Sequence, residues 1–275
     1  MMKLLLGTLL LRPYVFAFLA VFLVAAGRDL GWRRTLGFTG WVWLLAWVSE
    51  VASTRIGVPF GLYHYTGDTA GRELFVAGVP FMDSVSFTFL AYASFCLARV
   101  ALAGRPPSPV RLAVAAGFLM MLLDVVIDPL AVRGDRWFLG LIFYYPDGGV
   151  YFGVPLSNFA GWWLVGTLGV GGYLALAGVP DGRPGPGVGL YYGVLAFNLA
   201  VTAWIGEWVL FAIGLTLHAA SAAAVLGVRR ARDLASSSAG FAGAAVGGRH
   251  RKGGAAPLRG VMGEVSEGAV EAPSD

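Results

Sequence analysis

Two aspartates, Asp124 and Asp128, lie four residues apart within a strongly apolar run. On a helix they share a face, and charged groups inside a membrane helix usually face the bundle interior or a water-filled cavity. Two close carboxylates in a low-dielectric environment resist double ionisation, so one is expected to keep its proton near neutral pH. The pair therefore predicts acid–base chemistry. The alternative is that Asp128, next to Pro129, is simply solvated at a helix end.

A third acid, Glu50, ends another apolar run. Trp43, Trp47 and Glu50 are spaced four and three residues apart, so a helix places them on one face. A carboxylate between aromatic walls could shelter a cation. The alternative is an interfacial belt of tryptophans with a terminal acid.

Two loop segments resemble each other, and each follows a helix that carries acid near its end. Both contain tyrosines followed by a Gly-Val-Pro motif, at Gly78–Pro80 in the first and Gly153–Pro155 in the second. For Asn158 helix capping is the alternative role, and for Trp162 it is a place in an interfacial belt. The candidate site residues in these segments are Tyr63, Tyr65, Tyr145, Asn158 and Trp162.

The composition indicates that membrane helices position these residues. Only 13% of the 275 residues are charged and 57% are hydrophobic, whereas a soluble domain carries roughly 25% charged residues. Apolar runs near the roughly 20 residues needed to cross a bilayer recur along the chain. Arg12 and Pro13 limit the first of them. The predicted spans lie near 13–28, 35–54, 80–103, 110–130, 156–178, 188–206 and 208–228.

The distribution of arginine predicts the orientation, because cytoplasmic loops are enriched in basic residues. Arginines cluster after the first, third and seventh predicted spans, which places the C-terminus in the cytoplasm. The net charge of +4 is thus expected to meet anionic lipid headgroups and not nucleic acid. With one cysteine, three histidines and no nucleotide-binding loop, we expect neither a metal site nor a cofactor.

The predicted fold is all-α, a polytopic bundle of about seven spans. Spans 2–3 and 4–5 form a pseudo-repeated pair of helical hairpins whose equivalent loops lie on one face. The chain divides into a transmembrane domain, 1–234, and a tail, 235–275, which has few large apolar residues and is expected to be disordered.

Four blocks together resemble one known family: Gly57–Tyr65 after Glu50, Gly78–Pro80, Asp124–Pro129 and Tyr151–Trp162. This is the integral-membrane carotenoid biosynthesis family that includes the CruF-type carotenoid 1,2-hydratases and the archaeal bisanhydrobacterioruberin hydratase. The resemblance covers roughly residues 10–230. It implies a hydro-lyase that adds water across the terminal double bond of an acyclic ψ-end carotenoid. It also implies a lipid-soluble substrate, with membrane lipids and other enzymes of the pathway as partners.

Alkene hydration needs a strong acid, stabilisation of a tertiary cation, and a base that takes a proton from the attacking water. We assign Asp128 as the acid, Asp124 as its partner and Glu50 as the base, and the acid and base roles could be exchanged. Tyr63, Tyr65, Asn158 and Trp162 would orient water and line the cation, and Trp47 and Tyr145 complete the predicted substrate site. A lycopene-cyclase-like enzyme and a non-enzymatic lipid or carotenoid transport protein remain alternatives.

Overall fold

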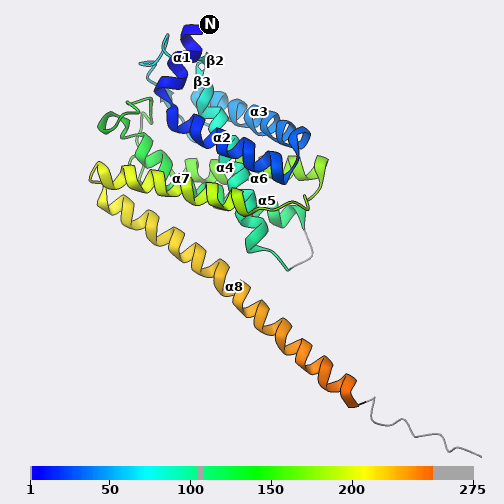
Figure 1. Ribbon diagram of the computed structural model, residues 1–275. Helices are drawn as coiled ribbons and strands as arrows, with labels where there is room; N and C mark the ends of the chain where they lie inside the picture. The colour runs from blue at the N-terminus through cyan, green and yellow to red at the C-terminus, as the bar shows by residue number, and fades with distance from the viewer. Residues whose placement is uncertain (1, 105–107, 250–275) are drawn as a thin grey trace, which may run out of the picture. The chain divides into compact units, whose positions relative to one another are not determined.

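The computed structural model describes residues 2–104 and 108–249, and the regular structure within them is almost entirely helical (Figure 1). The helices are α1 (Met2–Leu11), α2 (Pro13–Asp29), α3 (Trp32–Ile56), α4 (Phe81–Ala101), α5 (Pro109–Ala131), η1 (Gly134–Arg136), α6 (Leu156–Ala177), α7 (Gly185–Trp204) and α8 (Trp208–Arg249). The strands are β1 (His64–Tyr65), β2 (Phe75–Val76), β3 (Val79–Pro80) and β4 (Phe143–Tyr144). The predicted all-α class is confirmed.

The apolar helices make this a multi-pass membrane protein. Within the described residues, five helices, α4 to α8, are long and apolar enough to cross a bilayer. The α1–α2 pair, bent by 90° at Arg12, adds a sixth if it counts as one broken span. The 25-residue α3 is long enough to cross but more polar, with Arg33 and Arg34 in its first turn and Arg55 in its last. It is therefore not among the candidate spans, so the described residues contain five of them, or six with the bent pair, where about seven were predicted.

Prolines mark where most of these helices begin. Because proline lacks an N–H and fixes φ near the helical value, it suits a first turn. Helices α2, α5 and α7 have proline at a first-turn position. Pro80 directly precedes α4 and Pro155 directly precedes α6. The two Gly-Val-Pro motifs therefore start α4 and α6 in the same way.

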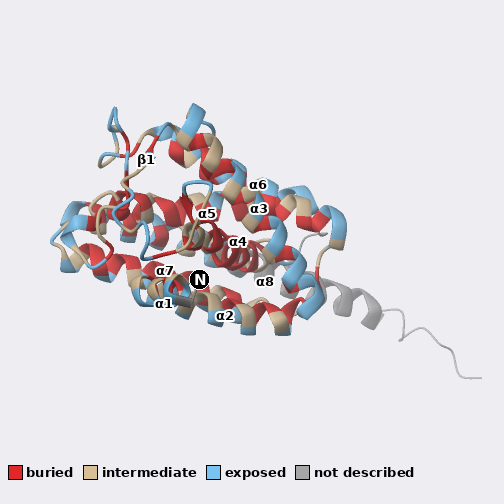
Figure 2. Cartoon of the chain, turned by 90° about the horizontal axis from the view of Figure 1, so that it is seen from above, coloured by how far each residue is buried: buried red, intermediate tan, exposed pale blue. Residues whose placement is uncertain are grey.

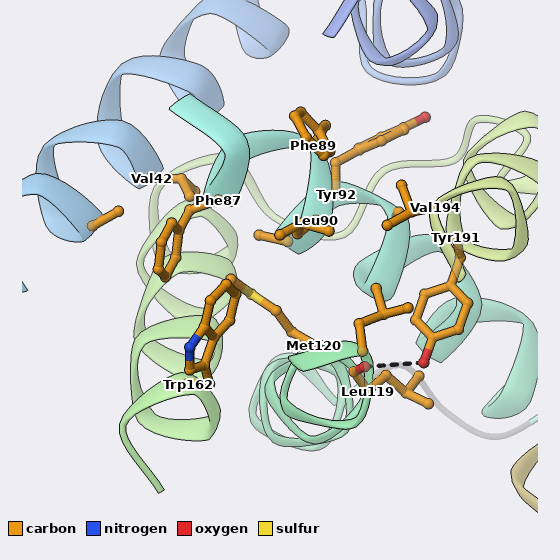
Figure 3. Close-up of a cluster of buried hydrophobic side chains, with 14 of the residues drawn as sticks. Val42, Phe87, Phe89, Leu90, Tyr92, Leu119, Met120, Trp162, Tyr191 and Val194 are labelled. Carbon is orange, nitrogen blue, oxygen red and sulfur yellow. Dashed lines mark hydrogen bonds between the residues drawn. The ribbon is translucent and has the colours of Figure 1, made fainter. Parts of the chain in front are cut away.

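Helix α4 lies at the centre of the bundle, and Figure 2 shows it almost entirely buried. It contacts α2, α3, α5, α6 and α7. Figure 3 shows the packing around it: the Phe87 ring of α4 stacks on Trp162 of α6 at 4.3 Å between centroids. On the other side of the same cluster, the Tyr191 hydroxyl of α7 donates to the Leu119 carbonyl of α5 at 3.0 Å. Helix α4 of the first predicted hairpin thus contacts both helices of the second, α5 and α6.

Small residues allow α5 and α6 to approach closely. A Cβ added at Gly166 would lie 2.9 Å from the Cα of Gly117, too close for any larger side chain. Such small-residue contacts are typical of membrane helix pairs. The close approach sets the distance between the aspartates of α5 and the side chains of α6.

The loops of the two hairpins meet, as the predicted pseudo-repeat requires. Strand β1 pairs with β4 in an antiparallel register, His64 opposite Tyr144 and Tyr65 opposite Phe143. The first loop also packs on α6, where a Cβ on Gly161 would lie 2.7 Å from the Pro59 carbonyl oxygen. The tyrosine-bearing segments therefore contact each other, and the first of them also contacts α6.

The C-terminal part of the chain differs from the expectation in one respect. Residues Met1–Arg229 form one compact unit and Arg230–Asp275 a second. Helix α8 continues to Arg249, so residues 235–249 are helical where no regular structure was expected. Residues 250–275 of the predicted tail lie outside the described residues. The domain boundary near residue 235 stays a prediction.

Deletion of residues 235–275 is expected to leave membrane insertion and activity nearly unchanged. The compact unit that ends at Arg229 contains every candidate site residue, and residues 235–275 are not part of that unit. Pigment conversion by membranes carrying equal amounts of full-length and truncated protein measures this. A truncated protein that inserts normally but converts no carotenoid would contradict the expectation.

Candidate active site

A cavity of about 130 Å³ lies where the two hairpins meet. Among its polar lining residues are Glu50 of α3, Asp128 of α5 and Asn158 of α6. Its volume is close to that of an engineered apolar cavity of about 150 Å³ that binds benzene. The cavity therefore has room for a small hydrocarbon group of about five carbons, but not for a long chain.

The aspartates of α5 share one donor from α6. The Nδ2 of Asn158 donates to the Oδ2 of Asp124 at 2.7 Å and to the Oδ2 of Asp128 at 2.8 Å. The indole N–H of Trp162 donates to the same oxygen of Asp128 at 3.3 Å. Asp124 is fully buried and does not line the cavity, whereas Asp128 does. The two acids thus lie on one face of α5, as predicted, and Asp128 is the one that reaches the cavity.

Glu50 approaches the cavity from the other hairpin. Its Oε1 accepts a hydrogen bond from the Tyr65 hydroxyl at 3.1 Å, and its Oε2 accepts a short one from the Ser84 hydroxyl of α4. The side chain is buried. Both donors are neutral, so the hydrogen bonds orient the carboxylate without pairing its charge.

Three loop tyrosines, Tyr63, Tyr65 and Tyr145, line the cavity beside these acids. Burial, followed by the negative charge of Glu50, raises the pKa of Tyr63 and of Tyr65 well above the usual range. Burial, followed by the charge of Asp128, likewise raises the pKa of Tyr145. All three therefore stay protonated and act as hydroxyl donors with aromatic faces.

Aromatic side chains form about half of the remaining wall. The Phe87–Trp162 stack lies at the acidic end. In another part of the wall, Phe197 of α7 stacks on Tyr14 of α2 at 5.1 Å and packs edge-on against Phe18 at 5.7 Å. These three rings of α2 and α7 line the cavity and are also partly exposed on the surface of the protein.

The structure places Trp47 away from the cavity, in contrast to the sequence-based expectation. Its indole N–H donates to the Val76 carbonyl of β2 at 3.1 Å, and its ring stacks on Trp43. A helical face spans a wide arc, so residues three apart need not point to the same cavity. Of the nine candidates, seven line the cavity, Asp124 lies behind Asn158, and Trp47 packs on the first loop.

Among the polar lining residues that sequence reasoning missed are Arg12, Asp83 and Asn198. Arg12 lies at the α1–α2 bend, and its guanidinium binds both Asp83 and Glu73, residues 71 and 61 positions away. Asp83 stands in the same place after its Gly-Val-Pro motif as Asn158 does, a signal that was present in the sequence. Within residues 2–104 and 108–249, no three His, Cys, Asp or Glu side chains gather as a metal site.

Comparison with known proteins gives two matches. The family model described as carotenoid biosynthesis protein matches residues 7–221. The bisanhydrobacterioruberin hydratase of Haloarcula japonica is 31% identical over 121 residues, which is 44% of this chain and 38% of that protein. The aligned segment thus spans well under half the length of that relative. No solved structure matches the chain.

Proposed function

Because the chain belongs to the family of carotenoid biosynthesis proteins, we propose that it is a carotenoid hydratase acting on an acyclic ψ-end group. It adds water across the terminal 1,2 double bond and yields a tertiary alcohol at C-1. The observation that carries this proposal is the cavity with Asp128 on one side, Glu50 on the other and aromatic rings between them. The name of the Haloarcula relative, a hydratase, supports the same reaction class.

The reaction begins with proton transfer from Asp128 to C-2 of the alkene. The two π electrons form the new C–H bond, and a tertiary cation is left at C-1. Asp124 sets the acidity of Asp128, because the two close carboxylates share one proton. Asn158 holds them in place by donating a hydrogen bond to each. The faces of Trp162 and the neighbouring tyrosines stabilise the cation by cation–π attraction.

Water then attacks C-1, and Glu50 takes the proton that the bound water loses. Tyr65 and Ser84 orient this carboxylate through their hydroxyls. The net change is one alkene plus one water to one alcohol, without oxidation or reduction. The proton on Glu50 returns to Asp128 through water in the cavity that both side chains line. Each turnover thereby restores the starting protonation state.

The substrate's long polyene lies outside the cavity. The space of about 130 Å³ admits one terminal isoprene unit, and the half-buried rings of α2 and α7 form the wall nearest the lipid. We infer that the chain passes between α2 and α7 into the bilayer. The enzyme works as a multi-pass membrane protein with its C-terminus in the cytoplasm, where other enzymes of the carotenoid pathway supply its substrate.

Isotope labelling tests the reaction directly. Membranes carrying the protein are expected to convert a ψ-end carotenoid without added nicotinamide, flavin or oxygen. In water enriched in heavy oxygen the new hydroxyl should carry the label, and in heavy water one deuterium should appear at C-2. Mass spectrometry of the extracted pigment measures both.

Other outcomes identify other functions. An isomeric product of unchanged mass would indicate cyclisation, in which an internal alkene captures the cation. A hydroxyl oxygen that came from molecular oxygen would indicate a monooxygenase and would exclude the acid mechanism. Binding of the carotenoid without any product would indicate a binding or transport protein.

A further inference from the structure

A buried arginine holds two carboxylates beside the cavity. Arg12, at the bend between α1 and α2, is 2% exposed. Its Nε and Nη2 contact the two oxygens of Glu73 at 3.1 and 3.0 Å, and its Nη1 donates to the Oδ1 of Asp83 at 2.8 Å. Because one cation faces two anions, the group has one negative charge that it does not neutralise itself.

The position of the two carboxylates decides where that charge acts. Glu73 takes the two-pronged contact, its side chain is 0% exposed, and it does not line the cavity. The side chain of Asp83 is 17% exposed and does line the cavity. The surplus negative charge of the group is therefore directed into the site.

Asp83 differs from the other acids of the cavity in its partners. Among the described residues, no lysine or arginine lies within salt-bridge distance of Glu50, Asp124 or Asp128. Their hydrogen-bond donors are neutral hydroxyl, amide and indole groups. The contact with the guanidinium favours the ionised form of Asp83, and the other three acids of the site have no such cation beside them.

The pseudo-repeat supports a role for Asp83 in the site. Asp83 is the third residue of α4, which follows Gly78-Val-Pro80, and Asn158 is the third residue of α6, which follows Gly153-Val-Pro155. In the second hairpin this position supplies an amide that binds the acids of α5. In the first hairpin it supplies a carboxylate, which lines the same cavity as Tyr65, the donor to Glu50.

We propose that Asp83, held ionised by Arg12, is a further catalytic residue whose fixed negative charge stabilises the carbocation. This inference rests on the proposed hydration. A preformed charge at a site where the opposite charge develops acts without reorganisation during the reaction, and in a water-poor cavity it acts strongly. Asp83 neither gives nor takes a proton in this role, which distinguishes it from Asp128 and Glu50.

A matched pair of variants tests the assignment. Asp83→Asn and Glu73→Gln each remove one charge, and each leaves Arg12 with one carboxylate. The two variants differ in whether the charge is lost from the cavity wall. The probes are an end-group analogue with a protonated tertiary amine in place of C-1 and its neutral saturated counterpart.

The native protein and Glu73→Gln are expected to bind the ammonium analogue more tightly than the neutral one. In Asp83→Asn the ratio of these two affinities is expected to fall by roughly 10²-fold. The rate of deuterium incorporation at C-2 of recovered substrate and product should fall by a similar factor in Asp83→Asn. An unchanged preference and an unchanged exchange rate in Asp83→Asn would overturn the proposal. An equal loss in Glu73→Gln would also overturn it, because the effect would then be structural.

Two further results keep the test decisive. If Asp83→Asn does not accumulate in membranes, Asp83→Glu keeps the charge and is expected to keep the preference for the ammonium analogue. Loss of the preference in folded Asp83→Glu would overturn the proposal. If the native protein makes no hydrated product, the proposed function fails. If it hydrates normally and Asp83→Asn does so equally well, only the role of Asp83 fails.

Discussion

Replacement of Asp128 by asparagine is expected to lower hydration by at least about 10³-fold, because the variant cannot protonate C-2. Asparagine keeps the size of the side chain, and its carbonyl oxygen can still accept from Asn158 and Trp162. Membrane insertion should therefore be unchanged. Product formation per amount of inserted protein, measured by pigment mass analysis, provides the comparison.

Asp124→Asn extends the same test to the partner acid. It is expected to impair hydration severely, since Asp124 shares the Asn158 donor and sets the acidity of Asp128. Glu207→Gln is a suitable control, because Glu207 pairs with Arg133 and Arg136 outside the cavity and should leave activity unchanged. Full activity in both aspartate variants would rule out the acid pair.

Replacement of Glu50 by glutamine is expected to lower product formation by about 10²- to 10³-fold by a different route. In this variant Asp128 can still protonate C-2, but the attacking water has no base, so the cation returns its proton and the alkene reforms. In heavy water the recovered substrate should therefore gain deuterium at C-2 while little alcohol forms. The Asp128→Asn variant should show neither exchange nor product.

The opposite pattern has an equally clear meaning. If Glu50→Gln abolishes deuterium exchange and Asp128→Asn preserves it, Glu50 is the acid and Asp128 the base. Exchange in both variants would require a different proton donor in the cavity. The two single substitutions thus assign the direction of proton flow.

The helices of this protein could be predicted because a bilayer-spanning helix leaves a long local signal. The predicted spans 110–130 and 156–178 correspond closely to α5 (Pro109–Ala131) and α6 (Leu156–Ala177). The spacing of Asp124 and Asp128 gave their shared face by helix geometry alone. The two loops were predicted to lie on one face because they are two spans apart. The antiparallel pairing of β1 with β4 shows which residues of the loops face each other.

The rest of the site depends on contacts between distant residues. In the sequence, Arg12 only limits the first apolar run. Its contacts with Glu73 and Asp83 become visible only in the folded chain. Trp47 follows the helical spacing to Glu50 but contacts Val76, because β2 occupies the space beside it. The spacing of residues along a helix does not predict which other segment packs against each side of it. The interpretation of Arg12 as a mere limit to a span therefore left out its ion pairs.

The size of the cavity has a consequence for carotenoids with two reactive ends. A space of about 130 Å³ holds one terminus at a time, and the chain has to leave it before the other end can follow. Each monomer is thus expected to act distributively: a symmetrical carotenoid dissociates after its first hydration and competes for a second visit. Early in a reaction the singly hydrated pigment should accumulate ahead of the doubly hydrated one. The amount of singly hydrated pigment in the bilayer would then depend on the ratio of enzyme to pigment and not on the length of the polyene.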